Sequence, residues 1–392
     1  MANRADLIGY YDPQHCDVRD FEACLDQVTR PENVPLAMAI EKNIPVYDSG
    51  KLLSALEGGG RRTVMTEWAQ VLQSGAGIVV LKGAYRDTCV LDQATEIYGR
   101  IIEQEKQNAG GGADHFAASG ANDRIWNSLQ KLCEAAPGVF MRYFANPAIS
   151  AVCEAWLGPN YQMTAQVNLV HPGGAAQQAH RDYHLGFQTA DVSAAYPAHV
   201  HEVSPILTLQ GAVAHCDMPL ESGPTKLLPF SQTYKPGYAA WRREDFRAVF
   251  EARCVQLPLS KGDAVFFNPA LFHAAGANSS SDIHRFVNLL QVSSAFGQAM
   301  ETVDREKMCR LVFPHAVRAS SEGTLTQAEL SAAIAATAEG YSFPTNLDRD
   351  PPSNGLAPET QAAYFTRAIE EGLSEDEFGA RLAEMKTVKL AT

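Results

Sequence analysis

Two residues with the chemistry of metal ligands, His180 and Asp182, are separated by one residue in the sequence QAHRD. In an extended strand, residues i and i+2 project from the same face, with their backbones about 7 Å apart. An imidazole nitrogen and a carboxylate oxygen placed in this way can bind one divalent cation. The pair therefore predicts part of a metal site, to which another segment must add a ligand.

The candidate for that further ligand is His273. It follows Gly262-Asp263, an apolar stretch at 264–267 and Asn268-Pro269, a pattern typical of a turn, a strand and a loop. Two histidines and one carboxylate on one face of an octahedral ion leave about three positions open. Such a site suits Fe(II) that must hold an organic cosubstrate and dioxygen, whereas zinc prefers a closed or four-coordinate site.

Arg285 begins the next apolar segment, in which Val287 and Leu289 share its face if the segment is a strand. A guanidinium on an apolar face needs an anionic partner, and the tail of a dicarboxylate suits its two-pronged geometry. Together with iron, Arg285 indicates 2-oxoglutarate as the cosubstrate. Judged without His273, the same arginine would most often form a structural salt bridge.

Other histidines compete for these roles. His215 and Asp217 repeat the same spacing, and spacing alone favours the first pair by only about two to one. His184 stands four residues after the first ligand, but the glutamate of a helical zinc motif is absent, so a hydrogen-bonding role on the substrate side is expected. His199 and His201 flank one valine in a probable loop and are expected at the surface.

The elements that must position these residues are short strands. Alternating or apolar segments bounded by Gly and Pro predict strands at 78–81, 164–170, 207–214, 264–268 and 285–293. Helical periodicity precedes the first of them and returns after residue 300. The pattern predicts a mainly β fold with flanking helices, built as a sandwich or small barrel.

Three regions follow from this pattern. Residues 1–65 carry scattered prolines and Gly58-Gly59-Gly60, which predicts an irregular N-terminal arm. Residues 66–300 hold the strands and their leading helices, with a glycine-rich loop at 110–112. Residues 301–392 form a helical extension, expected to pack on the core or to form a dimer contact.

The composition limits the classes of partner. The chain has 392 residues, with 46% hydrophobic and 20% charged residues, which is typical of a soluble globular protein. A formal net charge of −13 disfavours nucleic acid and anionic membranes. The eight cysteines form no C-x-x-C motif, and no secretory signal or membrane-spanning run is visible. A cytoplasmic protein that acts on a small molecule is expected, and the amphipathic C-terminal tail is compatible with a homodimer.

Taken in order, these motifs resemble the phytanoyl-CoA dioxygenase family over about residues 66–295. The segments that carry the resemblance are QSGAGIVVLKG at 73–83, HRD at 180–182, ESGP at 221–224, LLPFS at 227–231, KGD at 261–263, HAAGAN at 273–278 and Arg285. The resemblance implies a double-stranded β-helix, also called a jelly roll and similar to the cupins. It also implies an Fe(II)- and 2-oxoglutarate-dependent dioxygenase that oxidises a C–H bond of a small molecule and releases succinate and carbon dioxide.

The resemblance assigns His180, Asp182 and His273 to the metal and Arg285 to the distal carboxylate of 2-oxoglutarate. It also settles the competition with His215, because the strand that ends there corresponds to the one leading into the Gly-Pro turn. Since Asp182 is present where related halogenases carry Ala or Gly, hydroxylation-type chemistry is expected.

One position departs from the family. Relatives often carry a small hydroxyl residue two positions after the second histidine, where this chain has Ala275. Thr225 is a candidate to replace that hydroxyl. Gln166 and Asn168 alternate on the strand at 164–170, so they either bind the cosubstrate or lie on a solvated face. The segment 188–205 is a long insertion that could cover the site and confer specificity.

Two other functions stay open at this level. A cupin-type metal enzyme that does not use 2-oxoglutarate would keep the three metal ligands and would not need Arg285. A non-catalytic jelly-roll binding protein would need neither.

Overall fold

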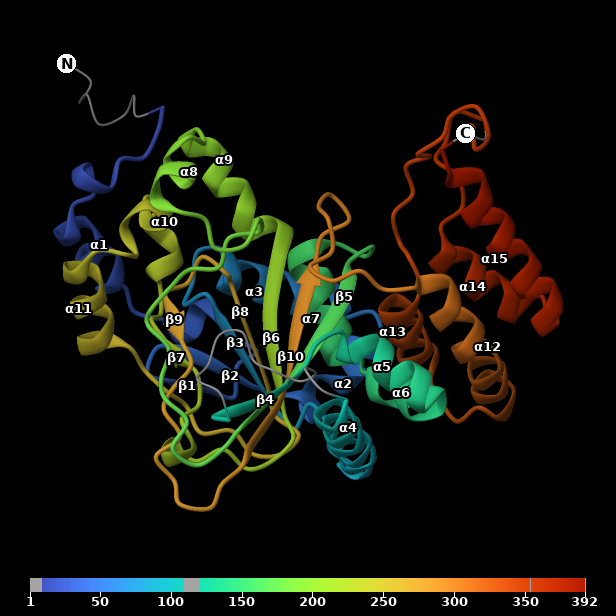
Figure 1. The fold of residues 1–392 in the computed structure, drawn as a ribbon, viewed down its shortest axis with the longest axis horizontal. Coiled ribbons are helices and arrows are strands. Elements are labelled where there is room, and N and C mark those ends of the chain that lie inside the picture. Colours follow the sequence, from blue (N-terminus) through green and yellow to red (C-terminus); the bar gives the residue numbers. More distant parts are fainter. Residues whose placement is uncertain (1–8, 109–119, 353, 392) are drawn as a thin grey trace.

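The structure is a computed structural model that describes residues 9–108, 120–352 and 354–391, so the glycine-rich loop expected at 110–112 lies outside the described residues. The described chain forms a large mixed sheet with helices around it (Figure 1). Its strands are β1 (Ala39–Glu41), β2 (Ile44–Asp48), β3 (Ile78–Lys82), β4 (Asn122–Ile125), β5 (Gln162–Val170), β6 (Thr208–Ala214), β7 (Lys226–Leu227), β8 (Ala264–Phe267), β9 (His273–Ala274) and β10 (Arg285–Ser293).

Among the described residues, the main sheet has eight strands in the order β1-β2-β3-β8-β6-β10-β5-β4. Neighbouring strands run antiparallel except for β2 and β3, which run parallel. β7 and β9 form a separate antiparallel pair. The five strands expected from the sequence are confirmed, with ends that differ by one or two residues.

The sheet with flanking helices is confirmed, although helices hold more of the described residues than strands do. The helices are α1 (Val18–Leu25), α2 (Ser49–Glu57), α3 (Arg61–Gln73), α4 (Cys89–Gln107), α5 (Ser128–Ala135), α6 (Pro137–Phe144), α7 (Pro147–Leu157), α8 (Ala190–Ala194), α9 (Ala198–Val203), α10 (Gly237–Ala240), α11 (Glu244–Arg253), α12 (Arg305–Glu322), α13 (Gln327–Thr337), α14 (Gln361–Glu370) and α15 (Glu375–Lys389).

The two faces of the main sheet have different roles, because successive side chains on a strand point to opposite faces. On β10, Phe286 and Leu290 join the large core formed with the helices. Val287 and Leu289 lie on the other face, in a smaller apolar cluster that includes Leu227 of β7. Arg285 shares that second face. The functional site therefore lies between the main sheet and the β7–β9 pair.

The prediction of an irregular arm over residues 1–65 is wrong for much of that segment. β2 pairs in parallel with β3 and extends the main sheet, and α2 follows it directly. Pro45 conceals this strand in the sequence, because proline lacks the N–H that a central strand donates. Here Pro45 stands at the start of the strand, before the pairing with β3 begins at Val46. The three glycines at 58–60 connect α2 to α3.

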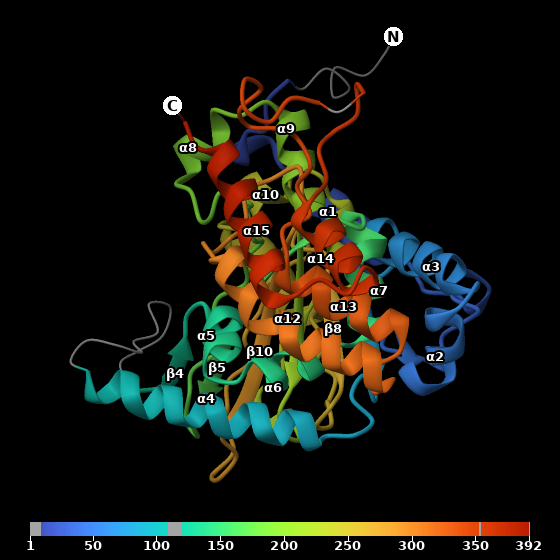
Figure 2. The same ribbon diagram turned by 90° about the vertical axis from the view of Figure 1, so that its right-hand side faces the viewer.

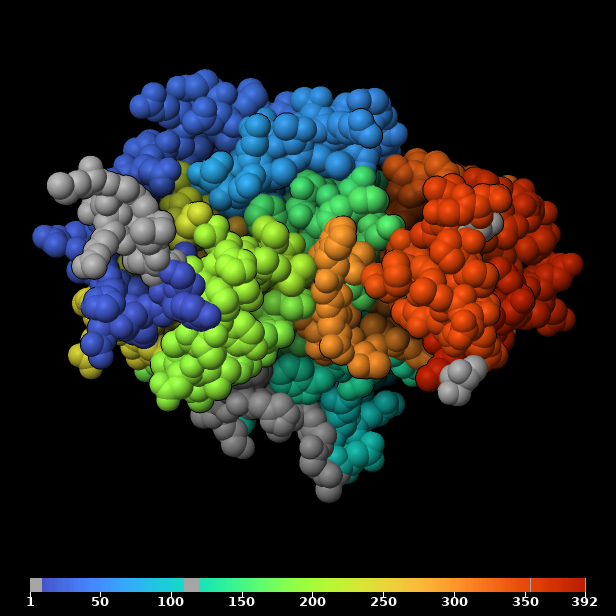
Figure 3. Space-filling model, turned by 90° about the horizontal axis from the view of Figure 1, so that it is seen from above, coloured from blue at the N-terminus to red at the C-terminus, as the bar shows by residue number. Residues whose placement is uncertain are grey.

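The C-terminal helices α12 to α15 pack against the rest of the molecule and share its main core. α12 contacts α5 and α6, and α13 contacts α6, α7 and β5. Figure 2 shows this group in front of the sheet, with α4 crossing below it. Seen from above, the group occupies one end of the molecule (Figure 3), and α13 also contacts α2. The expected packing of residues 301–392 on the core therefore matches these contacts.

Two further observations concern the cysteines and the helices. All eight cysteines are free thiols. Across the described ranges, the structure has no helix long and apolar enough to cross a bilayer.

We predict that Phe378→Ala lowers the free energy of unfolding of the whole chain by about 3–5 kcal/mol. Phe378 is buried and stacks on Phe313, with 3.8 Å between ring centroids, so its removal opens a cavity in the shared core. Phe343→Ala, at an exposed ring, is the control and should change little. Denaturant unfolding followed by circular dichroism should show one shifted transition. Two separate transitions, with only one shifted, would mean that the C-terminal helices fold independently.

Candidate metal and cosubstrate site

A short backbone pairing brings the two halves of the site together. The His180 N–H donates to the His273 carbonyl at 3.0 Å, and the His273 N–H donates to the His180 carbonyl at 3.1 Å. Two residues later, the Asp182 N–H donates to the Pro269 carbonyl at 3.0 Å. The segment that carries the first ligands is thereby aligned with the loop and strand that carry the second histidine.

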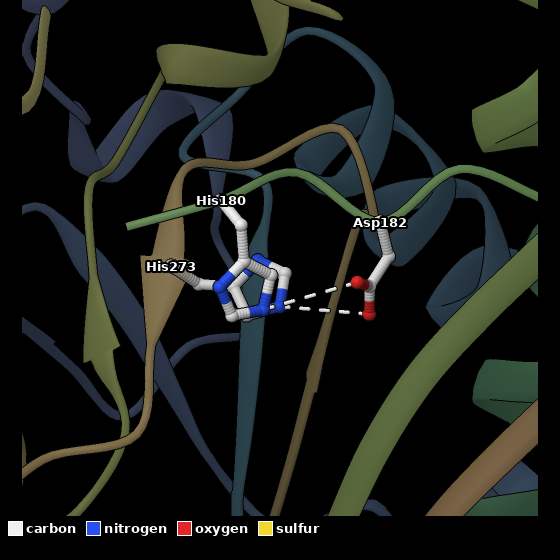
Figure 4. Close-up of side chains that lie close together, drawn as sticks. All are labelled: His180, Asp182 and His273. Atoms are coloured by element: carbon white, nitrogen blue, oxygen red, sulfur yellow. Dashed lines mark ion pairs between the residues drawn. The ribbon is translucent and has the colours of Figure 1, made fainter. Parts of the chain in front are cut away.

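The three side chains converge as the sequence predicts, and Figure 4 shows both imidazoles facing the carboxylate. His180 Nε2 lies 3.8 Å from Asp182 Oδ1, and His273 Nε2 lies 3.7 Å from Asp182 Oδ2. One ligand atom from each residue lies within 4.8 Å of the others. Ligands about 2.1 Å from a metal and at right angles are about 3 Å apart, so small side-chain movements would close the site around an ion.

The two histidines are held in the tautomer that a metal requires. His180 Nδ1 lies 2.8 Å from the Gln178 carbonyl oxygen, and His273 Nδ1 lies 2.8 Å from the Leu271 carbonyl oxygen. A carbonyl only accepts hydrogen bonds, so each Nδ1 carries the proton. Each Nε2 then keeps its lone pair, which points toward Asp182. Backbone carbonyls orient metal-binding histidines in this way in many proteins.

The charge states also favour a cation. Burial lowers the pKa of the His180 imidazole, and the neighbouring His273 lowers it further, so His180 is neutral near pH 7. Burial alone would raise the pKa of the Asp182 carboxyl. The contacts with His273 and His180 and a hydrogen bond from Gln210 outweigh that effect and lower the pKa to about 2. Asp182 is therefore a carboxylate beside a neutral nitrogen ligand.

Arg285 is buried on the same pocket without an anionic partner. Burial lowers the pKa of its guanidinium to about 10, which still leaves it charged near pH 7. Its Nη1 donates to the carbonyls of Ser222 and Gly276, at 3.1 and 3.0 Å. No carboxylate in the described part of the chain forms an ion pair with it. A buried charge without a counter-charge is costly, so this arginine is suited to bind an anion from outside the chain.

The ligands and Arg285 line one cavity of about 320 Å³. The three other residues predicted to bind the cosubstrate, Gln166, Asn168 and Thr225, also line it, as does Ala275. Gln166 Oε1 accepts a hydrogen bond from Arg124 at 3.1 Å, and the Asn168 side-chain oxygen is buried without a partner. The solvated-face alternative for these two side chains is therefore wrong.

Several residues of the cavity were not found from the sequence. Gln210, on the central strand β6, donates a hydrogen bond to Asp182 Oδ2. Gln291 follows Arg285 on the same face of β10, so counting every second residue from Arg285 would have found it. No comparable signal points to Trp126, Phe187 or Met300, which reach the cavity from connecting segments or strand ends.

Arg181, between the two ligands, points to the opposite side and anchors the segment. Its side chain is almost fully buried, donates to the Ser231 carbonyl and stacks over the ring of Phe272 at 4.9 Å. Tyr238 on α10 donates its hydroxyl proton to the Asp182 carbonyl at 3.0 Å. A Cβ atom on Gly237 would overlap the Arg181 guanidinium, so a glycine is required where α10 begins.

Of the competing pair, His215 has a structural role on the helix side of the sheet, and Asp217 lies exposed in the loop after β6. His215 Nδ1 lies 2.7 Å from the Thr95 hydroxyl, whose own proton goes to a carbonyl of α4, and His215 Nε2 lies 2.8 Å from the Tyr143 hydroxyl. Both ring nitrogens are therefore satisfied by neutral groups. Asp217 accepts from the Lys261 backbone N–H at 2.9 Å. Neither residue faces the cavity.

The remaining histidines also lie outside the cavity. His184 Nδ1 lies 2.8 Å from the Thr208 hydroxyl, so His184 forms a hydrogen bond within the chain and not on the substrate side, where it was expected. His199 is exposed as predicted, but His201 is buried among tyrosine rings, so its surface placement was wrong. The insertion at 188–205 contains α8 and α9, and no cavity-lining residue comes from it. Tyr183, Gly186 and Phe187, just before the insertion, line the cavity instead.

A family model matches more than half of the chain. Residues 74–286 match the family model described as phytanoyl-CoA dioxygenase (PhyH). The protein named dioxygenase andF from Emericella variicolor is 27% identical over 147 residues, which are 36% of this chain and 45% of that protein. The chain thus matches less than half of the length of that relative.

Two solved structures align with part of the chain. The non-heme alpha ketoglutarate dependent epimerase SnoN from nogalamycin biosynthesis is 19% identical, with a TM-score of 0.41, over 60% of this chain and 82% of that one. The carbocyclase SnoK from nogalamycin biosynthesis is 17% identical, with a TM-score of 0.44, over 64% of this chain and 92% of that one. Similarity at this level says nothing about the chemistry of the present chain.

We predict that Gly237→Ala weakens metal binding and lowers the free energy of unfolding by about 1–3 kcal/mol. The added methyl group displaces Arg181 and with it the backbone that carries the ligands on either side. Gly99→Ala on α4, where a Cβ atom meets no neighbour, is the matched control and should leave metal affinity unchanged. Calorimetric titration with Co(II) and thermal melting measure both effects. Wild-type metal affinity in Gly237→Ala would contradict the anchoring role.

A second prediction concerns pH. Burial, reinforced by Lys261, lowers the pKa of His215 to about 3, whereas in the unfolded chain it is near 6.5. The unfolded state therefore binds the extra proton, and His215 should destabilise the folded state by about 2 kcal/mol between pH 7.5 and pH 5. His215→Gln removes that dependence. The stability difference between wild type and variant, measured by urea unfolding, should shrink as pH falls; a constant difference would contradict the assignment.

Proposed function

We propose that this chain, which belongs to the phytanoyl-CoA dioxygenase family, binds Fe(II) through His180, Asp182 and His273 and binds 2-oxoglutarate through Arg285. The prediction of a dioxygenase that uses iron, 2-oxoglutarate and dioxygen agrees with that family. The observation that carries the proposal is the unpaired guanidinium of Arg285 on the same cavity as two imidazoles and a carboxylate. If Arg285 had only a structural role, a carboxylate of the chain would be expected to pair with its guanidinium.

The donor set suits ferrous iron. Two neutral imidazole nitrogens and one carboxylate oxygen on one side of an ion leave the opposite positions free, whereas a structural zinc site would close around the metal. When bound, iron with 2-oxoglutarate and dioxygen supplies the oxidation of a C–H bond of the substrate, with succinate and carbon dioxide as the other products. The role of His180, Asp182 and His273 is to hold the metal at the end of the cavity.

Arg285 orients the cosubstrate. Its guanidinium keeps N–H groups available for a carboxylate, while Nη1 is fixed by the carbonyls of Ser222 and Gly276. We assign Thr225, which lines the cavity, the hydroxyl role that Ala275 leaves vacant. Gln166 and Asn168 complete the proposed cosubstrate contacts from β5. Asn168 can turn either its amide nitrogen or its oxygen to a ligand, since its oxygen has no partner.

The substrate in this proposal is a small molecule with an apolar body. Apolar side chains supply most of the cavity lining, and Trp126, Phe187 and Met300 are among the large ones that come from outside the strands. Such walls exclude water from the reacting atoms, which protects a reactive oxidant from side reactions. The molecule to be oxidised would lie between these three side chains and Asp182.

The finer architecture belongs to the same proposal. The β7–β9 pair, together with isolated bridges such as His180–His273 and Leu227–Val255, would form the second, smaller sheet of a double-stranded β-helix opposite the main sheet. Residues 66–300 would then be the catalytic unit, with 301–392 as its helical extension. A homodimer contact through that extension and a cytoplasmic location stay predictions.

The alternatives explain fewer of these features. A cupin-type metal enzyme without 2-oxoglutarate has no use for the buried charge of Arg285. A non-catalytic binding protein has no need for histidines held with Nε2 free beside a carboxylate. No specific observation on the described residues favours either alternative.

We predict that the purified protein with Fe(II) and ascorbate converts 2-oxoglutarate to succinate, and that the correct substrate increases the rate. His180→Ala and Asp182→Ala should abolish both iron binding and succinate release, while His199→Ala, an exposed histidine, should change neither. Arg285→Ala should raise the KM for 2-oxoglutarate about 10- to 100-fold, because it removes charge-assisted hydrogen bonds. Unchanged turnover in His180→Ala or Asp182→Ala would remove these residues from the site.

A further inference from the structure

We propose that Gln210 is a positioning residue that restrains Asp182 to bind the metal through one carboxylate oxygen. The inference rests on the proposed function, because it assumes that Asp182 is a metal ligand. Gln210 itself is placed by the sheet alone, in the middle of β6 and opposite Gln291 on β10. It is buried and donates its amide proton to Asp182 Oδ2.

The orientation of the Gln210 amide is fixed by its neighbours. Its nitrogen faces two oxygen atoms, Asp182 Oδ2 and, at 3.5 Å, the side-chain oxygen of Gln291. If the amide were turned over, its oxygen would face the carboxylate, and the two acceptors would repel each other. The amide nitrogen is therefore the group that Asp182 meets, and it can only donate.

This contact limits what Asp182 can do. The Asp182 backbone is tied to the Pro269 carbonyl and to the Tyr238 hydroxyl, so the remaining freedom is rotation of the carboxylate about its side-chain bonds. A hydrogen bond to Oδ2 opposes that rotation and withdraws one lone pair of Oδ2 from the metal. A carboxylate that bound through both oxygens would occupy a further coordination position, which the cosubstrate or dioxygen needs.

The register of β6 alone determines that the Gln210 side chain faces the cavity. Leu209 joins the core on the helix side, and a Cβ atom on Gly211 would meet Phe266 of that core, while the side chains of Gln210 and Ala212 line the cavity. Gln210 thus couples the position of β6 to the orientation of Asp182, a proposed metal ligand that lies in a different segment. Hydrogen bonds of this kind to metal ligands typically change metal affinity 10- to 100-fold when they are removed.

The test compares Gln210→Met, which keeps the volume but removes the donor, with Gln210→Asn, whose amide is one methylene too short to reach Asp182. The matched control is Gln162→Met on β5, which loses hydrogen bonds to the Ser294 and Gly297 carbonyls but lies outside the cavity. Circular dichroism and thermal melting establish that each variant is folded. Two measurements follow on the whole protein: the dissociation constant for Co(II) and the ligand-field absorption spectrum of the Co(II) protein.

Both Gln210 variants should bind Co(II) about 10- to 100-fold more weakly and show a changed spectrum, because the coordination of the carboxylate changes. Gln162→Met should match wild type in both measurements. Wild-type affinity and spectrum in a folded Gln210 variant would overturn the inference and leave the proposed function intact. If instead wild type and His180→Ala bind Co(II) equally well, the metal site itself is wrong, and both proposals fall.

Discussion

The pair of backbone hydrogen bonds between His180 and His273 is the interaction on which the site depends. The two residues lie in segments far apart in the sequence, and each donates its N–H to the carbonyl of the other. This reciprocal contact sets the distance between the two imidazoles, whose ring centroids are 4.4 Å apart. Asp182 then takes its place because it is two residues along the same extended segment.

A second constraint is the alternation of side chains in the main sheet. Each central strand gives one face to the large core and the other to the cavity, so apolar residues such as Phe286 and Leu290 stabilise the fold while Arg285 faces inward. The position of the cosubstrate site is therefore set by the same register that builds the core. A shift of one residue in β10 would exchange the two sets.

Two buried arginines near the site have different roles. Arg181 and Arg285 are both almost fully buried, and neither forms an ion pair with a carboxylate in the described ranges. Arg181 is satisfied by a carbonyl and by aromatic rings, which anchor the ligand segment from behind. Arg285 keeps free N–H groups on a cavity. The first arrangement is that of an anchor, and the second is that of a binding group.

The sequence was sufficient for features that depend on local pattern and short spacing. The strands around Val79, Gly211 and Leu290 follow from apolar alternation, and His180 with Asp182 follows from the geometry of an extended chain. Capping boxes at Thr326 and Ser374, visible in the sequence as a hydroxyl residue three positions before a glutamate, begin α13 and α15.

Features that depend on long-range pairing were missed. β2 was overlooked because Pro45 interrupts its apolar run, and only its pairing with β3 reveals the strand. Gln210 has no motif of its own, because its role comes from a neighbour on another segment. The burial of His201 depends on rings from several segments, including Tyr11 and Tyr238, which spacing along the chain cannot show.

The most direct test of the central claim is X-ray absorption at the iron edge of the anaerobic Fe(II) protein, with and without 2-oxoglutarate. The account predicts two imidazole nitrogens and one carboxylate oxygen as protein ligands, and water ligands that the cosubstrate replaces when it is added. An iron environment that contains a thiolate, fewer than two imidazoles, or no change on addition of 2-oxoglutarate would contradict it.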